Sequence, residues 1–245
     1  VTLVIPGFTA AALIALPYMD RNPATEPDVE GIWFRSRHGR RLTAINTVLG
    51  IVITTAWVIL DEAYAEFADP EDLPDWSRLI HDERNVIVTR TFSKAYGLAG
   101  ARLGYAVAHP DMITVIDTVS EPFNANRIGL AGAISVLTEA QEEYRTALTK
   151  ILCDRQRVSE ALCELGMQVV PSSTNFIFFE TPYNAQQLAW QLLQKGIIVR
   201  PCAFWRHPNA LRVTIGTSAQ MDRFLSEFQD ALKNLESAAK VHENV

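Results

Sequence analysis

The chain has 245 residues, of which 48% are hydrophobic and 20% charged, so it can bury a sizeable core and form one or two globular domains. Its formal net charge of -6 argues against a nucleic-acid-binding protein, because neutralising phosphates usually requires a basic excess. The cysteines form no C-x-x-C pair and the histidines no H-x-x-x-H pair, so no metal site is expected. A reducing cytoplasm suits this cysteine content.

Residues 1–56 are the least informative part of the chain and stay unassigned. The apolar stretch Leu3–Met19 is interrupted by Pro6 and Pro17 and is shorter than the roughly 20 residues of a membrane span, so no membrane partner is expected. A basic cluster then follows, and a solvated face is favoured for it over an anion site. Its members are Arg35, Arg37, His38, Arg40 and Arg41.

Three strands are predicted in the first half. The segment Ile51–Leu60 is apolar and β-branched without alternation, which is typical of a strand buried on both faces of a parallel sheet, and it ends on Asp61. An acid at the carboxyl end of such a strand lies where open α/β sheets bind ligands. Asn85–Thr91 and Ala101–Ala108 are predicted as two more strands, separated by a glycine-bearing turn.

Helical periodicity dominates the next part. It covers Asp111–Val119 and a long run from about Ile128 to Leu165, which Gly166 ends. The elements predicted beyond are a strand at Thr174–Glu180, a helix at Ala185–Lys195, strands at Ile197–Arg200 and Leu211–Gly216, and a final helix. The chain is therefore divided into residues 57–149, an α/β cofactor domain, and residues 150–245, a small α+β domain.

A set of polar residues carries the chemistry. Asp61 is followed three residues later by Tyr64, and the run Thr91-Phe-Ser-Lys94 is followed eight residues later by Arg102. Each has an ordinary explanation alone, as a helix cap or a surface charge. Together they match pyridoxal phosphate (PLP), which needs an amine, a carboxylate on its pyridinium nitrogen and donors for a phosphate dianion.

The expected roles follow from these needs. Lys94 supplies the amine and Asp61 the carboxylate, while Tyr64 can donate to the phenolic oxygen of the ring. The phosphate site would combine the guanidinium of Arg102 with two hydroxyls, those of Thr91 and Ser93. A catalytic Ser93–Lys94 dyad is less favoured, because adjacent residues on an extended backbone point to opposite faces.

The run from Trp57 to about Leu137 resembles the core of fold-type I PLP-dependent aminotransferases, and of the histidinol-phosphate aminotransferase family in particular. The motif T-F-S-K-A-Y-G-L-A-G-x-R-x-G-Y carries the resemblance. It implies a mostly parallel, here incomplete, sheet domain and the catalytic residues Lys94, Asp61 and Tyr64. It also implies a homodimer in histidine biosynthesis, with histidinol phosphate and glutamate/2-oxoglutarate as small-molecule substrates.

The same resemblance extends to substrate-binding residues. Asn124 lies in E-P-F-N-A-N, Arg200 in V-R-P and Arg212 in L-R-V-T-I-G, and the two arginines correspond to residues that hold anionic substrate groups in the family. A guanidinium fork can accept a carboxylate or a phosphate ester. The competing interpretation is an exposed arginine at a strand end.

The amino end departs from the family. No small-residue phosphate loop, ring-stacking aromatic residue or N-P-x-x-P-T-G turn is legible before Trp57. We therefore expect residues 1 to about 50 to come from a disrupted reading frame or a truncated gene. The alternatives left open are an aromatic-amino-acid aminotransferase, a threonine-phosphate decarboxylase and a non-catalytic remnant.

Overall fold

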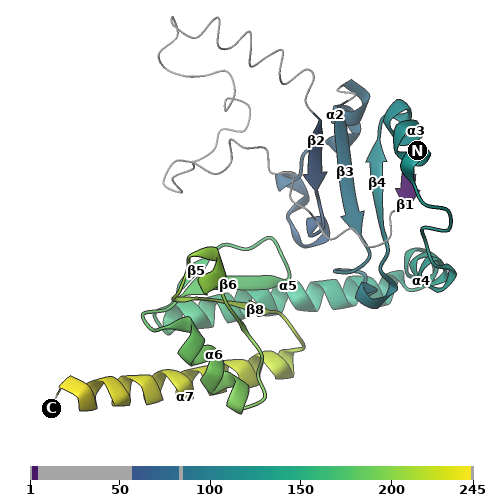
Figure 1. Ribbon diagram of the computed structural model, residues 1–245. Coiled ribbons are helices and arrows are strands. Elements are labelled where there is room, and N and C mark those ends of the chain that lie inside the picture. Colours follow the sequence, from purple (N-terminus) through teal and green to yellow (C-terminus); the bar gives the residue numbers. More distant parts are fainter. Residues whose placement is uncertain (1, 5–56, 83–84, 244–245) are drawn as a thin grey trace, which may run out of the picture. The chain divides into compact units, whose positions relative to one another are not determined.

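The computed structural model describes residues 2–4, 57–82 and 85–243, which form two compact units (Figure 1). The predictions made for the basic cluster and for the start of the strand Ile51–Leu60 lie outside these residues. The first unit contains the described residues of Val1–Ala63, Pro74–Ser93 and Leu98–Leu130, and the second those of Tyr64–Leu73, Lys94–Gly97 and Ala131–Val245.

The first unit contains a four-stranded sheet. Its strands are β1 (Thr2–Val4), β2 (Val58–Asp61), β3 (Val86–Thr91) and β4 (Gly104–Ala108), in the order β1-β4-β3-β2 (Figure 1). β2 and β3 are parallel, whereas β4 is antiparallel to both β3 and β1. The α/β fold class is confirmed, and the described part of its sheet is mixed, with one parallel pair.

The chain between β3 and β4 makes a tight reversal. A 3₁₀ turn, η4 (Ala99–Ala101), stands where the strand Ala101–Ala108 was predicted to begin, so that prediction was wrong at its start. The reason is Arg102, whose left-handed backbone, with φ of 52°, cannot continue an extended strand.

Among the described residues, two α-helices belong wholly to the first unit. α2 (Trp76–Asp82) was not predicted, whereas α3 (Pro110–Val119) is confirmed. Pro110 occupies the first helical turn of α3, where its missing N–H is harmless, and the His109 ring Nδ1 accepts a hydrogen bond from the Asp111 N–H at 3.4 Å.

The long helical run predicted from Ile128 to Leu165 is two helices. α4 (Arg127–Thr138) and α5 (Gln141–Glu164) are separated by a break at which the Ser135 carbonyl accepts hydrogen bonds from the N–H groups of residues 139 and 140, at 2.7 and 3.0 Å. Gly166, with φ of 81°, ends α5 as predicted. α5 runs through residue 150, and the proposed domain boundary there stays a prediction.

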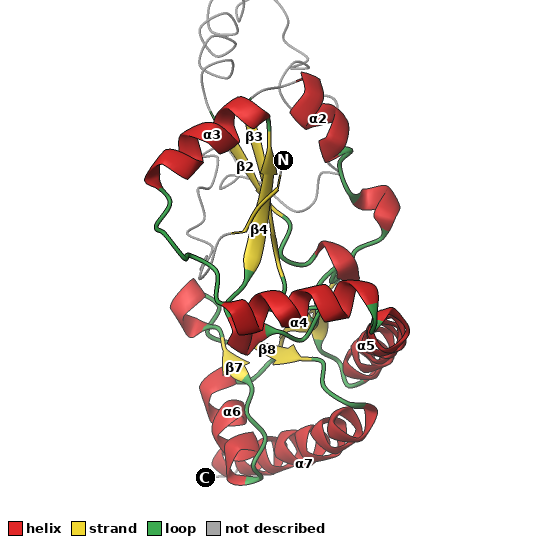
Figure 2. Cartoon of the chain, turned by 90° about the vertical axis from the view of Figure 1, so that its right-hand side faces the viewer, coloured by secondary structure: helices red, strands yellow, loops and turns green. Residues whose placement is uncertain are grey.

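The second unit is a four-stranded antiparallel sheet backed by helices. The strands β5 (Gln168–Val170), β6 (Phe176–Glu180), β7 (Arg200–Pro201) and β8 (Ala210–Thr214) have the order β5-β6-β8-β7. α6 (Ala185–Gln194) and α7 (Ser218–Glu243) lie on one side of it, as Figures 1 and 2 show. No helix in the described part of the chain is both long and apolar enough to cross a membrane.

The predicted start of β7 needs correction. β7 begins only at Arg200, not at Ile197, because the Ile197 N–H still bonds to the Leu192 carbonyl in the turn that ends α6 at Gly196. The short strand β5 was not predicted.

Buried and more exposed side chains alternate along β6 and β8, so one face of this sheet lies in the core and the other does not. Ile177 and Phe179 of β6 and Leu211 and Val213 of β8 are buried in the core with α5, α6 and α7. The residues between them, among them Phe176 and Arg212, are only partly buried and therefore belong to the other face.

A buried carboxylate joins α5 to α7. The Asp154 carboxylate accepts hydrogen bonds from the Ser218 hydroxyl at 2.6 Å and from the Arg157 guanidinium at 2.7 and 3.1 Å, and Arg157 also reaches Asp222 at 2.6 Å. The Ser218 hydrogen bond, followed by that of Arg157, lowers the pKa of Asp154. Ionised Asp154 therefore stabilises the helix pair.

We predict that Ser218→Ala lowers the free energy of unfolding by about 1–2 kcal/mol near pH 7, because it removes a hydrogen bond to an ionised, buried carboxylate. The pKa of Asp154 is lower in the folded than in the unfolded chain, so this stabilisation is present above the unfolded value of about 4 and is lost as the pH falls through the folded value. Urea unfolding at several pH values measures it, and the difference from wild type should shrink in acid.

Ser237→Ala is the matched control, because the Ser237 hydroxyl donates only to the Lys233 carbonyl of its own helix, at 2.8 Å. Equal destabilisation by the two variants at pH 7 would contradict the role given to Asp154.

Candidate active site

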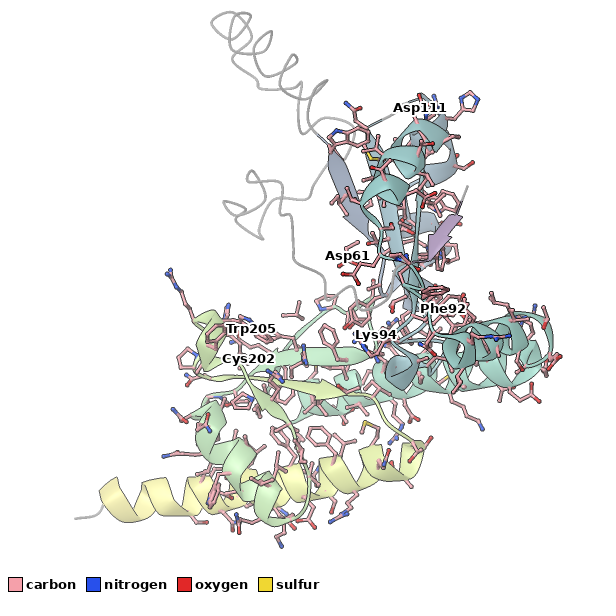
Figure 3. All side chains as sticks on the ribbon, turned by 45° about the vertical axis from the view of Figure 1, so that its right-hand side comes forward. Asp61, Phe92, Lys94, Asp111, Cys202 and Trp205 are labelled. Atoms are coloured by element: carbon pink, nitrogen blue, oxygen red, sulfur yellow. The ribbon has the colours of Figure 1, made fainter. Side chains whose placement is uncertain are left out.

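Asp61 is the last residue of β2 and is exposed (Figure 3). Its Oδ1 accepts a hydrogen bond from the Ala63 N–H at 3.2 Å, a local contact that orients the carboxylate at the strand end. The next residue, Glu62, is buried and accepts two hydrogen bonds from Arg90 of β3, at 2.7 and 3.0 Å. Both hydrogen bonds end on Glu62 Oε2, and this ion pair fixes the carboxyl end of β2 against β3.

Thr91 and Ser93 lie together at the end of β3. The Ser93 N–H donates to the Thr91 hydroxyl at 3.0 Å, and the Phe92 N–H between them donates to the Leu103 carbonyl at 3.1 Å. Residues 92–94 form a bend. The prediction of an extended backbone at Ser93 and Lys94, on which the argument against a Ser93–Lys94 dyad depended, was therefore wrong.

The loop that carries Arg102 is held by a residue whose role sequence reasoning missed. The Asn126 amide donates to the Ala101 carbonyl at 2.8 Å, and its oxygen accepts from the Gly129 N–H at 2.7 Å at the start of α4. The exposed Arg102 guanidinium donates to the Ala99 carbonyl at 3.0 Å. Asn124, partly buried, lies two residues before Asn126.

The remaining predicted site residues belong to the second unit. The Lys94 Nζ lies 5.3 Å from the centroid of the Tyr64 ring, so the structure brings these two side chains together. The turn after Lys94 closes when the Gly97 N–H donates to the Lys94 carbonyl at 3.0 Å, and Gly97 has φ of 70°, which a residue with a side chain adopts only with strain. Tyr96 stacks on Tyr144 of α5, with ring centroids 4.9 Å apart.

Tyr64 is positioned by its neighbours in the same unit. Its ring meets Phe176 of β6 edge-on, with centroids 5.6 Å apart. The 3₁₀ turn after it, η2 (Ala65–Phe67), is tied down by Arg155 of α5, whose guanidinium donates to the carbonyls of Phe67 and Thr174 at 3.0 and 2.8 Å. Burial lowers the pKa of Arg155. Sequence reasoning missed this arginine because its position in a helix is typical of a surface charge.

Arg212 and Arg200 face each other across β8 and β7. The Arg212 guanidinium carbon lies 5.0 Å from the centroid of the Phe176 ring and 5.7 Å from that of Trp205. Like charges directly opposite each other on antiparallel strands are unfavourable, so this pair favours an anion. Within the described ranges neither arginine forms a salt bridge.

The predicted site residues thus divide between the units. Asp61, Thr91, Ser93, Arg102 and Asn124 belong to the first, and Tyr64, Lys94, Arg200 and Arg212 to the second. Among the residues that the structure describes, no group of three His, Cys, Asp or Glu side chains could hold a metal ion.

Comparison with known proteins identifies the family. Residues 44–228 match the model of aminotransferase class I and II, and the chain belongs to this family. The match includes every residue predicted for the site.

Among curated relatives, the chain is similar to histidinol-phosphate aminotransferase 2 of Nitrosospira multiformis, with 37% identity over 74% of this chain and 46% of the relative. It is also similar to an aromatic amino acid aminotransferase of Nocardia farcinica, with 38% identity over 77% of this chain and 51% of the relative. The chain spans about half the length of these relatives.

A solved structure with the same fold is the histidinol-phosphate aminotransferase of Sinorhizobium meliloti in complex with pyridoxal 5'-phosphate. The TM-score is 0.69 and the sequence identity 33%, over 77% of this chain and 53% of that one. The predicted fold-type I architecture is therefore confirmed for the part of the fold that the chain spans.

We predict that Arg155→Ala destabilises the second unit by about 2–4 kcal/mol, because it leaves two carbonyls in a partly buried site without their donor. Hydrogen exchange should accelerate at Phe67 more than along the core strand β6. Arg145→Ala, an exposed arginine on the same helix, is the control. Equal protection of the Phe67 amide from exchange in both variants would contradict the role given to the Arg155 hydrogen bonds.

Proposed function

We propose that this chain is the core of a PLP-dependent aminotransferase that moves an amino group between histidinol phosphate and 2-oxoglutarate in histidine biosynthesis. The observation that carries the proposal is Lys94 in the turn after β3, inside the class I and II match, with its Nζ next to the Tyr64 ring. Similarity to histidinol-phosphate aminotransferases supports the substrate pair.

The residues present fit PLP by their chemistry. Two hydroxyls, from Thr91 and Ser93, and the guanidinium of Arg102 are donors suited to a phosphate dianion. The exposed carboxylate of Asp61 can hold a proton on the pyridine nitrogen, and the Tyr64 hydroxyl can donate to the phenolic oxygen. When bound, PLP supplies an electron sink for the charge that develops at the substrate carbon.

Lys94 has two tasks in this mechanism. Its amine would hold the cofactor until the amino substrate takes its place. As a free amine, Lys94 would be the group that accepts the proton from the substrate carbon and later gives it up, as general base and then general acid. Asp61 would hold a proton on the ring nitrogen of the bound cofactor.

The substrates need anion-binding groups that accept both partners in turn. Arg212 and Arg200, opposite each other on β8 and β7, can bind a carboxylate of 2-oxoglutarate or the phosphate ester of histidinol phosphate. Asn124 is proposed as a further contact to the substrate. We also propose a homodimer in the cytoplasm as the working form.

The alternative substrate class is an aromatic amino acid, which the similarity to an aromatic amino acid aminotransferase favours. Amino-donor profiling with histidinol phosphate, phenylalanine and tyrosine separates the two. A preference for the aromatic donors would replace histidinol phosphate in the proposal.

We predict that borohydride reduction of the chain incubated with PLP fixes the cofactor covalently to the peptide that contains Lys94. Lys94→Ala should lose the visible absorbance band and essentially all amino transfer, because the amine that bonds the cofactor is gone. Peptide mapping by mass spectrometry measures the labelling. Labelling of another lysine, such as the exposed Lys150 on α5, would sink the assignment.

We predict that Asp61→Asn retains PLP but loses most of the turnover, since a neutral amide cannot keep the ring nitrogen protonated. Steady-state rates and the cofactor absorbance measure the two effects separately. Asp69→Asn is the control, because Asp69 is an exposed carboxylate that only caps the 3₁₀ turn Pro70–Asp72. Near-normal turnover in Asp61→Asn would show that Asp61 is merely a local cap.

A further inference from the structure

We propose that Trp205 and Phe176 are positioning residues: their rings both contact the Arg212 guanidinium, and together they act as a clamp that orients it toward the anionic group of a substrate. The clamp is inferred from geometry, and the identity of the anion as a dicarboxylate substrate rests on the proposed function.

The two rings approach Arg212 from different elements. Phe176 belongs to β6 and pairs in register with Thr214, two residues along β8 from Arg212, so the two side chains are diagonal neighbours on one face of the sheet. Trp205 belongs to the 3₁₀ turn η5 (Ala203–Trp205) in the connection between β7 and β8 (Figure 3). The guanidinium carbon lies 5.0 and 5.7 Å from the two ring centroids, within the range of a cation–π contact.

The two rings are held by different means. Phe176 is fixed by the β6–β8 ladder and by its edge-on contact with Tyr64. Trp205 is 45% exposed, so its own burial does not hold it in place. The connection that carries it is closed by the Cys202 N–H, which donates to the Ala210 carbonyl at 2.9 Å, and by His207, which bonds to the Glu180 carboxylate at 2.9 Å.

The backbone beside Trp205 is strained. Arg206 has φ of 65°, a left-handed conformation that residues with side chains seldom adopt because it is energetically unfavourable. A half-exposed indole at the end of this turn would gain little from such a conformation by burial alone. We therefore attribute this backbone conformation to the contact between Trp205 and Arg212.

Clamping suits anion binding because of the shape of the guanidinium. Rings that contact its flat faces leave the N–H donors at its edge available to a carboxylate in the same plane. A free arginine loses rotamer entropy when it is immobilised on a ligand, and a clamped one has already lost part of that entropy. The directly opposite Arg200 adds a second positive charge on the same face.

The first test needs neither cofactor nor activity. The full chain is treated with phenylglyoxal, which modifies arginines, and the rate at Arg212 is followed by peptide mass spectrometry. A cation–π contact of about 0.5–1 kcal/mol predicts a roughly two- to fivefold faster reaction in Trp205→Ala. Trp205→Phe should react at nearly the wild-type rate, and Arg145, which is exposed on α5, serves as the internal standard.

Trp190→Ala is the matched control, because Trp190 is another exposed tryptophan of the same unit, on α6, and 61% exposed. It should leave the Arg212 rate unchanged. An unchanged Arg212 rate in Trp205→Ala, or an equal increase in Trp190→Ala, would overturn the clamp.

The second test addresses the anion. Trp205→Ala should raise the KM for 2-oxoglutarate roughly two- to fivefold and leave kcat within about twofold, while Trp205→Phe restores the KM. A fall in kcat without a change in KM would overturn the positioning role. If the wild-type chain neither binds PLP nor transfers amino groups, the proposed function fails, whereas the modification rates still decide whether the clamp exists.

Discussion

The alternation of side chains along β6 and β8 is the constraint on which the second unit depends. Ile177 and Phe179 must enter the core with the helices, so Phe176 must lie on the other face, and the same reasoning places Arg212 there once Leu211 and Val213 are buried. A shift of one residue in the pairing register of either strand would move its buried side chains to the other face of the sheet. The core that stabilises the unit thus fixes the face on which its chemistry lies.

Two short segments that are distant in sequence from the rest of the second unit also belong to it. Tyr64–Leu73 is tied by the Arg155 guanidinium, and Lys94–Gly97 by the stacking of Tyr96 on Tyr144. Both anchors lie on α5, a single helix of 24 residues. The proposed catalytic amine therefore belongs to the same compact unit as the proposed substrate arginine, although 118 residues separate Lys94 from Arg212 in the sequence.

Much of this arrangement could be predicted from the sequence, because hydrophobic periodicity and the backbone preferences of single residues determine where strands and helices begin and end. The strand β3, the glycine stop at Gly166 and the strand β8 follow from periodicity and backbone preference. The family motif led to the prediction of Lys94 as the cofactor-binding lysine. The break between α4 and α5 could not be predicted, since no proline or glycine marks it. Arg155 could not be recognised either, because its acceptors are carbonyls 88 and 19 residues away.

On the partly buried face of the second sheet, a carboxylate lies near the two arginines but binds another residue. Glu180 follows Phe178 by two positions on β6, and Phe178 is the register partner of Arg212, so Glu180 is a diagonal neighbour that could neutralise the guanidinium. His207 instead bonds to Glu180 at 2.9 Å and packs edge-on against the Phe178 ring. Among the described residues, the ion-pair partner of Glu180 is therefore His207 and not Arg212 or Arg200. The connection between β7 and β8 thus contributes two contacts on this side of the sheet: Trp205 contacts the Arg212 guanidinium, and His207 binds the nearby Glu180 carboxylate.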